Sequence, residues 1–408
     1  MAPMTPADLE TPARLDELLT LCVRRDGSDL HLVAGLPPHL RVHGELDAIA
    51  GAPELTSEDT RRFAEILLRR MANRDAGEPC VDAALAARGS VDGAVTTRDN
   101  CRFRFNIFRR QSEISIALRR LEDQFRTLAQ LGLPDSLYQL CRLRDGLVIV
   151  SGPTGAGKST TLAALLDFVN RNRSGHIITI EDPIEYVHQR VRCVINQRQV
   201  GIDAPTFNDA LVASLRQDPD VVLVGEIRDL ETIRTAITAA ETGHLVFTTL
   251  HAGDCVGSIE RLVSVFPSGE QDGVRRQLAL VLRGVVAQHL LPGPQPTEPD
   301  ATSVARTVAS EILMVTPAVA NLIATARSAQ IYSAMESGAS LGMQTLEQDL
   351  ARLWVAGHIT ETTAETMARN SATLRDRATL LRRRSANGNG NGNGNGHAAS
   401  HNKPGNKE

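Results

Sequence analysis

The chain has 408 residues, of which 42% are hydrophobic and 23% are charged. That length predicts two or three domains, and that composition can fill packed cores, so a wholly disordered chain is excluded. The formal net charge of -4 and the aromatic content of 3% argue against a chain that binds nucleic acid over its whole surface.

The cysteines are spread widely along the sequence and include no Cys-x-x-Cys pair. This spacing favours reduced thiols over a disulfide framework or a zinc site. The sequence also contains no apolar run near 18 residues and no secretory signal at its N-terminus. We therefore expect a cytoplasmic protein without direct membrane insertion. The six cysteines are Cys22, Cys80, Cys101, Cys141, Cys193 and Cys255.

Residues 1–122 predict a small α+β domain. Apolar residues recur at helical spacing within 13–25, and the segment 56–59 resembles the capping box at the start of a second helix. Alternation of apolar and polar residues predicts strands, of which the last two are expected to pair as a hairpin. These strands are expected at 29–33, 40–43, 102–109 and 114–118. A linker is expected at 123–134.

Residues 135–384 predict an α/β domain. Short β-branched runs alternate with helical segments, which is typical of a parallel sheet covered by helices. Helices are expected to continue to about residue 381 after a proline-rich loop at 292–300. Five consecutive Asn-Gly pairs indicate a disordered tail over 385–408. The β-branched runs are 147–150, 177–180, 221–224 and 245–249.

The strongest motif follows the first of these runs. Residues 152–159 fit the phosphate-binding pattern GxxxxGK[ST] at every defined position. Glycines let the loop curl so that its N–H groups face the phosphates of ATP, Lys158 is expected to reach the terminal phosphates, and the Ser159 hydroxyl is expected to bind Mg²⁺. The expected nucleotide contacts are Gly152, Pro153, Thr154, Gly155, Ala156, Gly157, Lys158, Ser159 and Thr160.

Polar residues also follow the other three runs, at 181–185, at 225–226 and at His251. Because ligands bind beyond the carboxyl ends of the strands in an open parallel sheet, these residues are expected to meet at one nucleotide. Phosphoryl transfer needs a positioned water, a held metal ion and neutralised charge. Glu226 ends a strand that resembles Walker B and is expected near Mg²⁺. Glu185 is the other candidate for orienting the water, and the residues alone do not divide the two roles.

Five stretches together resemble the PilT-type ATPases of the secretion ATPase superfamily, the motors of type IV pili. In chain order they are similar to the opening of a PAS-like N-terminal domain, the phosphate loop, an Asp box, an atypical Walker B strand and a His box. A phosphate loop alone occurs in very many proteins, whereas these five in order are specific. The stretches are 28–38, 152–160, 180–185, 215–226 and 242–252.

The resemblance implies a PAS-like domain followed by a RecA-like ATPase domain with a parallel sheet and C-terminal helices. It implies a homo-hexameric ring with ATP between the two domains of each subunit. It also implies that Glu185 polarises the water, that Glu226 supports Mg²⁺, and that His244 and His251 sense or steady the phosphates. Arg216, in the Walker B stretch, joins the catalytic candidates. Three arginines of the N-terminal domain are candidates to approach the phosphates: Arg104, Arg109 and Arg119.

The implied function is pilus retraction, with the ring docked on a platform protein at the inner-membrane base of the pilus and a second pilus ATPase as a further candidate partner. Extension and type II secretion ATPases usually carry a four-cysteine zinc insertion after the His box. Here Cys255 is the last cysteine, and the segment 340–346 matches the retraction branch.

One stretch departs from that branch, which typically reads Ala-Ile-Arg-Asn-Leu-Ile-Arg-Glu where this chain has residues 318–325. The apolar spacing survives, so this helix is still expected to pack, but both arginines and the glutamate are lost. An auxiliary or regulatory paralogue with weak hydrolysis therefore stays open, as does a pilus assembly or type II secretion ATPase. A nucleic-acid motor of the RecA type is disfavoured by the acidic charge.

Overall fold

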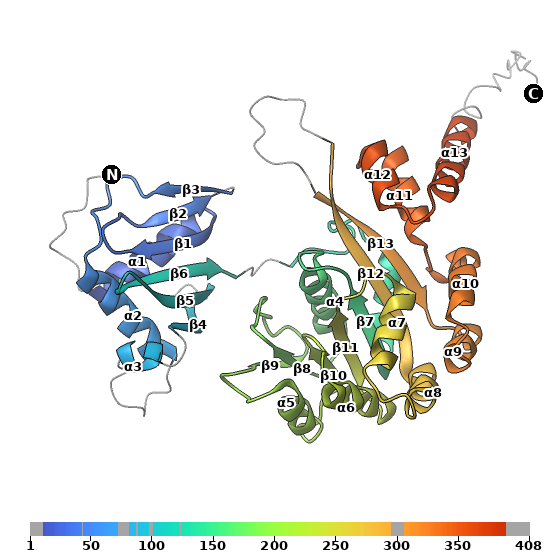
Figure 1. Cartoon of the computed structure of the whole chain (residues 1–408), viewed down its shortest axis with the longest axis horizontal. Helices are drawn as coiled ribbons and strands as arrows, with labels where there is room; N and C mark the ends of the chain where they lie inside the picture. The colour runs from blue at the N-terminus through green and yellow to red at the C-terminus, as the bar shows by residue number, and fades with distance from the viewer. Residues whose placement is uncertain are drawn as a thin grey trace, which may run out of the picture.

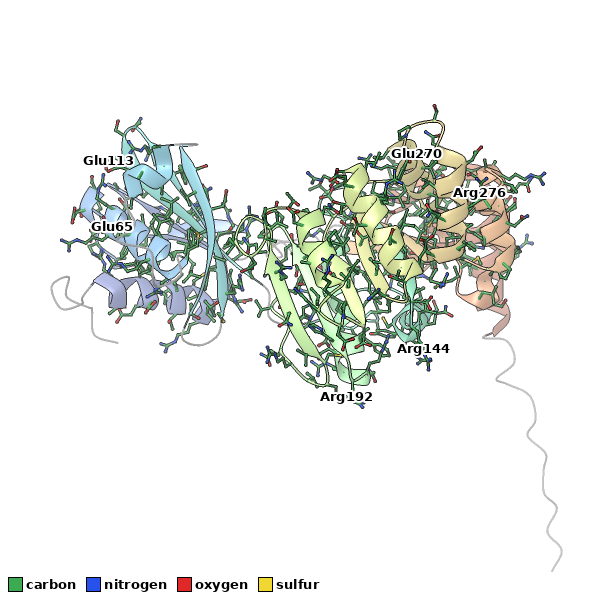
Figure 2. The ribbon with its side chains drawn as sticks, turned by 90° about the horizontal axis from the view of Figure 1, so that it is seen from below. Glu65, Glu113, Arg144, Arg192, Glu270 and Arg276 are labelled. Atoms are coloured by element: carbon green, nitrogen blue, oxygen red, sulfur yellow. The ribbon has the colours of Figure 1, made fainter. Side chains whose placement is uncertain are left out.

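The computed structural model describes residues 11–42, 44–71, 81–86, 89–97, 101–121, 125–294 and 306–388. Two sheets, each with its own hydrophobic core, organise the chain (Figure 1). Charged side chains such as Glu113, Arg192 and Glu270 extend outward from the surface (Figure 2). The predicted tail lies outside the described residues from position 389 onward.

The N-terminal sheet is antiparallel, with the strand order β3-β2-β1-β6-β5-β4. Alternation along β5 places Phe103, Phe105 and Ile107 in the core, and the predicted β5–β6 hairpin is present. Thr56 and Asp59 bond to each other's backbone N–H across the first turn of α2, as the capping box predicts. The elements are α1 (Thr11–Arg24), β1 (Gly27–Val33), β2 (His39–Val42), β3 (Glu45–Ala48), α2 (Ser57–Met71), α3 (Val81–Ala86), β4 (Ser90–Thr96), β5 (Arg102–Arg110) and β6 (Glu113–Arg120).

The second sheet has the strand order β13-β12-β7-β11-β10-β8-β9. All four predicted runs form neighbouring parallel strands at its centre. Sequence reasoning missed the strands at both edges, where β9 is parallel to β8 and β13 is antiparallel to β12. The strands are β7 (Gly146–Ser151), β8 (His176–Glu181), β9 (Val194–Gln199), β10 (Val221–Val224), β11 (Leu245–Leu250), β12 (Leu282–Pro292) and β13 (Arg306–Met314).

Helices pack on this sheet, and the core that they share with it is large and almost entirely aliphatic. Each residue of β7 is buried, which is typical of a parallel strand covered on both faces. The elements are η1 (Asp135–Arg142), α4 (Lys158–Asn172), α5 (Phe207–Ser214), α6 (Leu230–Glu241), α7 (Cys255–Ser264) and α8 (Gln271–Val281).

The C-terminal helices extend from the β13 edge of the sheet (Figure 1). Leu346, Leu350 and Leu374 form a separate small core there with Leu291 of β12 and Ala309 of β13. This core anchors the helical part to the two strands. The elements are α9 (Pro317–Ala324), η2 (Ser328–Gln330), α10 (Ile331–Ser337), η3 (Ala339–Leu341), α11 (Leu346–Val355), α12 (Glu361–Met367) and α13 (Ser371–Gly388).

Two boundaries differ from their expected positions. Leu128 and Leu133, within the predicted linker, are buried in the second core, so that core begins before residue 135. Helix α13 runs four residues past the start of the predicted tail, to Gly388. Across the described ranges, no helix combines the length and apolar character needed to span a bilayer.

Candidate nucleotide-binding site

The phosphate-binding loop joins the end of β7 to the start of α4. Gly152, Gly155 and Gly157 adopt φ values of 149°, 79° and 87°, a region that favours glycine. A Cβ atom added at Gly152 would lie 2.3 Å from the backbone oxygen of Gln288. The glycines of the motif are therefore required by backbone conformation and, at Gly152, by the close approach of a neighbouring strand.

Gln288 on β12 supports this loop from beneath and was not predicted from the sequence. Its side chain is fully buried, its Nε2 donates to the Ala156 carbonyl at 2.7 Å, and its Oε1 accepts from the Thr161 hydroxyl at 2.9 Å. One amide thus satisfies two buried polar groups of the loop and of α4. No local motif marks this glutamine, because its partners lie more than 120 positions earlier in the chain.

Replacing Gln288 with leucine is expected to destabilise the fold by about 1–3 kcal/mol, because a similar volume is kept while two buried polar groups lose their partner. Nucleotide affinity is expected to fall with it, since the loop loses its support. Thermal unfolding and titration with a fluorescent ADP analogue measure the two effects. Unchanged stability and affinity in Gln288→Leu would contradict the supporting role.

A cavity of about 610 Å³ opens beyond the carboxyl ends of β7, β8, β10 and β11. The convergence expected from a parallel sheet is therefore present, because residues that follow all four strands line one space. The predicted residues that line it are Thr154, Gly155, Ala156, Gly157, Lys158, Ser159, Thr160, Glu185, Glu226 and His251.

Glu226 is held from two sides at this cavity. Arg228 Nε and Nη2 donate to its two carboxylate oxygens at 2.5 and 2.6 Å, and His251 Nε2 lies 3.2 Å from Oε1. Burial alone would raise the pKa of Glu226, but these hydrogen bonds and the nearby positive charges lower it below its ordinary value. Glu226 is thus kept as a carboxylate at a fixed position.

Two further glutamates, one at the end of β8 and one shortly after it, line the same cavity and differ in environment. Glu181 is half-buried and accepts from Thr179 at 2.6 Å and from Gln197 at 3.2 Å, and burial raises its pKa despite these bonds. Glu185 is exposed at the cavity. Of the two, Glu185 is better placed to bind a water in the open cavity, whereas the Glu181 carboxylate already accepts hydrogen bonds from Thr179 and Gln197.

Lys158 begins α4, and its Nζ donates to the carbonyls of Gly152 at 2.9 Å and Pro153 at 3.0 Å. Partial burial lowers its pKa below the ordinary value, although the carboxylates of Glu226 and Glu185 act in the opposite direction. The ammonium therefore lies within the loop, beside the positive N-terminal end of the helix. Together these groups form an anion-binding site.

Seven predicted site residues are not among those that line the cavity. Gly152 and Pro153 belong to the phosphate loop, and the other five lie elsewhere in the structure. His244 precedes β11 and so lies at the amino edge of the sheet, about 20 Å from His251 by strand length. Its Nδ1 is 3.0 Å from the Ala239 carbonyl. Arg216 is exposed just after α5, also away from the cavity. Neither residue lines the cavity of the subunit, and their catalytic roles stay predictions.

The three arginines of the N-terminal sheet are likewise not among the residues that line the cavity. Each is paired with an aspartate of its own domain, and its contact with a nucleotide stays a prediction. The pairs are Arg104–Asp92 at 3.8 Å, Arg109–Asp82 at 2.5 Å and Arg119–Asp29 at 2.7 Å.

Two other arginines line the cavity, Arg228 after β10 and Arg306 at the start of β13. Sequence reasoning missed both of them. Arg228 stands two residues after the Walker B glutamate, a local clue that could have identified it. Arg306 is brought in by the pairing of β13 with β12, for which the sequence gave no such clue.

The chemistry of the cavity suits Mg²⁺ bound together with a nucleotide. Its donors include the Ser159 hydroxyl and the Glu226 carboxylate, which are the oxygen ligands that this ion prefers. No group of three or more His, Cys, Asp or Glu side chains that could hold a metal occurs in the described part of the chain. Mg²⁺ would accordingly need phosphate oxygens as well as protein ones, which is its usual mode.

The fold and the cavity define a P-loop nucleotide-binding ATPase domain joined to an N-terminal α+β domain. A family model described as "Type II/IV secretion system protein" matches residues 12–353. This chain belongs to that family.

The chain is also similar over nearly its full length to characterised pilus proteins. It is 40% identical to the type IV pilus retraction ATPase PilT of Pseudomonas aeruginosa, over 87% of this chain and 98% of the relative. It is 38% identical to the type IV pilus ATPase PilU of the same organism, over 85% and 86%. A crystal structure of the pilus retraction motor PilT with bound ADP matches with a TM-score of 0.78 at 40% identity, covering 89% of this chain and 99% of that one. The family and fold predicted from the sequence are confirmed.

Proposed function

We propose that this protein is a motor ATPase that hydrolyses ATP to ADP and phosphate and uses that energy to power type IV pilus retraction. This proposal rests mainly on one observation: the phosphate loop, Glu185, Glu226 and His251 line the same cavity. The near full-length similarity to PilT, a retraction motor crystallised with ADP, supports the same reading.

The proposed roles of the residues follow from their surroundings. The loop N–H groups and Lys158 bind the phosphates, and Glu185, exposed at the cavity, orients the attacking water. Ser159 and Glu226 would hold Mg²⁺, which when bound neutralises charge on the phosphates. His251 contacts Glu226, so we propose that a movement of the Glu226 carboxylate is passed to His251. Arg228 and Arg306 supply further positive charge at the cavity.

The proposed assembly is a cytoplasmic homo-hexamer docked on a platform protein at the inner-membrane base of the pilus, with no nucleic acid. In the subunit, the N-terminal arginines do not line the cavity. Their approach to a nucleotide would need a domain movement or a neighbouring subunit, either of which a ring allows. Nucleotide-driven change in the angle between the domains is the proposed source of motion.

A second candidate function is an auxiliary retraction motor that works beside another ATPase. Two observations favour it. Helix α9 keeps Val319 and Ile323 buried, as predicted. Ala320 and Ala324, which are partly buried, and the exposed Thr325 just after the helix carry no charge where the retraction branch has two arginines and a glutamate. The chain is also nearly as similar to PilU as to PilT.

Gene deletion combined with an ATPase assay separates these functions. A principal retraction motor predicts piliated cells that cannot retract their pili, together with steady-state ATP hydrolysis by the purified wild-type chain. Retraction that persists after deletion, with an active purified enzyme, would favour the auxiliary role. Loss of all pili would overturn retraction in favour of pilus assembly, and purified protein without hydrolysis would overturn the motor.

A further inference from the structure

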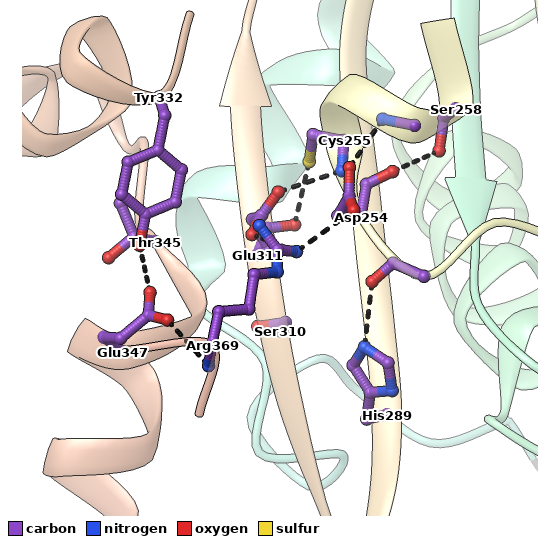
Figure 3. Close-up of polar contacts among 12 residues, drawn as sticks. Asp254, Cys255, Ser258, His289, Ser310, Glu311, Tyr332, Thr345, Glu347 and Arg369 are labelled. Atoms are coloured by element: carbon purple, nitrogen blue, oxygen red, sulfur yellow. Dashed lines mark hydrogen bonds and ion pairs between the residues drawn. The ribbon is translucent and has the colours of Figure 1, made fainter. Parts of the chain in front are cut away.

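A group of charged side chains joins the C-terminal helices to the ATPase core. Arg369 lies between α12 and α13, and its Nη2 is 2.9 Å from Glu311 on β13 and 3.5 Å from Asp254 before α7. Its backbone N–H donates to Glu347 on α11 at 3.2 Å. Figure 3 shows these three carboxylates arranged around the one arginine, with Tyr332 bonded to Glu347 on the far side. We call these five residues the Arg369 cluster.

The cluster fixes the start of α7. Glu311 Oε1 accepts from the backbone N–H of Cys255 at 2.9 Å, so the carboxylate that Arg369 neutralises also anchors this backbone. Asp254 caps the helix by accepting from the Gly257 N–H at 2.5 Å. The carbonyl of Gly253, one residue earlier, accepts from His289 at 3.0 Å. The backbone from 253 to 257 is therefore held by side chains of β12 and β13 and by its own Asp254.

This held segment adjoins two parts of the nucleotide site. His251, which contacts Glu226 in the cavity at 3.2 Å, lies only three residues before Asp254. Ser258, in the first turn of α7, donates to the hydroxyl of Ser151 at 2.8 Å, and Ser151 immediately precedes the phosphate loop. A displacement of α7 would consequently reach both His251 and the base of that loop.

The charges of the cluster require the arginine. Glu311 is 1% exposed and Glu347 is fully buried, so neither carboxylate can be solvated by bulk water. Burial raises the pKa of Glu311, and the positive charge of Arg369 opposes that rise. Arg369 itself is 39% exposed, but its removal leaves the buried Glu311 carboxylate without its opposite charge, which is locally destabilising.

We propose that Arg369 is a positioning residue for ATP hydrolysis, which ties the C-terminal helices to residues 251–258 and thereby keeps His251 and the base of the phosphate loop in the arrangement that turnover needs. This inference rests on the proposed ATPase function. Arg369 is not among the residues that line the cavity, so it acts through Asp254 and Glu311 rather than on the nucleotide. Movement of the C-terminal helices and the rate of hydrolysis are coupled through this contact.

The test compares the full-length Arg369→Gln variant with a matched control, Arg352→Gln. Arg352 also lies in the C-terminal helices and pairs at 2.7 Å with a fully buried carboxylate, Asp349, so its loss carries a similar folding cost. Asp349 bonds to Ser310 on β13 rather than to residues 251–258. The measurements are kcat and KM for ATP, affinity for a fluorescent ADP analogue, and hydrogen exchange of peptides covering 252–258.

Arg369→Gln is expected to lower kcat about 10-fold while ADP affinity changes less than about 3-fold, and to speed exchange at 252–258. Arg352→Gln is expected to keep wild-type kcat and exchange there, and Arg369→Lys is expected to restore part of the loss. If Arg369→Gln does not fold, the same measurements are made on Asp254→Asn, because asparagine keeps the helix cap and loses the ion pair with Arg369.

Wild-type kcat in Arg369→Gln or Asp254→Asn, or an equal loss in Arg352→Gln, would overturn the positioning role. An inactive wild-type enzyme would overturn the proposed ATPase function instead. In that case the exchange comparison still decides whether Arg369 holds residues 251–258, so the two failures are distinguishable.

Discussion

Replacing Lys158 with alanine is expected to weaken nucleotide binding at least about 100-fold, because charge-assisted hydrogen bonds from an ammonium to phosphate are worth about 1.5–3 kcal/mol each. The Lys158 ammonium lies within the loop at the N-terminal end of α4, where the helix also favours an anion. Alanine removes the charge and keeps the backbone N–H groups. ATP turnover at ordinary nucleotide concentration is therefore expected to be lost.

Titration with a fluorescent ADP analogue measures this effect, and thermal unfolding checks that the variant folds. Lys158→Arg is the matched variant: it keeps the charge, but a planar guanidinium does not fit a site shaped for a compact ammonium, so only partial recovery is expected. The chain offers an independent readout, since its only other lysines are Lys403 and Lys407. ATP should protect Lys158 alone from an amine-reactive reagent. Tight binding by Lys158→Ala would refute the role of this loop.

Glu185→Gln is expected to reduce turnover about 100- to 1,000-fold while nucleotide affinity changes little. The exposed Glu185 carboxylate can accept a hydrogen bond from water at the cavity, and the neutral amide is a much weaker acceptor for an attacking water. Glu226→Gln is expected to cut turnover similarly and, in addition, to raise the Mg²⁺ concentration needed for half-maximal rate. Its carboxylate is the one held by Arg228 and His251.

Steady-state kinetics over ATP and Mg²⁺ concentrations, together with ADP affinity, separate the two glutamates. Glu231→Gln is the control, because Glu231 is exposed in the first turn of α6 and is not among the residues that line the cavity. It should retain the wild-type rate. Equal Mg²⁺ dependence in Glu185→Gln and Glu226→Gln would reject the proposed division of roles, and full activity in Glu185→Gln would reject its catalytic role.

The central strands of the second sheet could be predicted because each is a short β-branched run that must be buried on both faces. The edge strand β9 (Val194–Gln199) could not, since it is half-exposed and its last four residues, 196–199, are all polar. The long strands β12 and β13 were missed for a different reason: they pair with each other on either side of the expected proline-rich loop, of which residues 295–300 lie outside the described ranges. Edge pairing depends on partners distant in the sequence, which local patterns do not report.

The candidate site shows the same division. His251 follows β11 and lies in the cavity, whereas His244 precedes β11 and lies at the opposite edge of the sheet. The rule that ligands bind at carboxyl ends supports only His251, so a role of His244 at the phosphates stays a prediction that this rule does not favour. The arginines differ from this case. Nothing local distinguishes Arg306, which lines the cavity, from Arg104, which pairs with Asp92 in the other domain.

The sequence by itself determined the phosphate loop, the four central strands with their parallel direction, and the family, because each depends on contiguous residues whose spacing is dictated by backbone geometry. Only the tertiary structure decided which cations face the nucleotide cavity, which amide supports the loop from beneath, and how the C-terminal helices reach residues 251–258. Gln288, Arg306 and Arg369 owe their positions to β12, β13 and the turn before α13. Such contacts join positions far apart in the chain, so they form only when the sheet brings those positions together and cannot be predicted from local patterns.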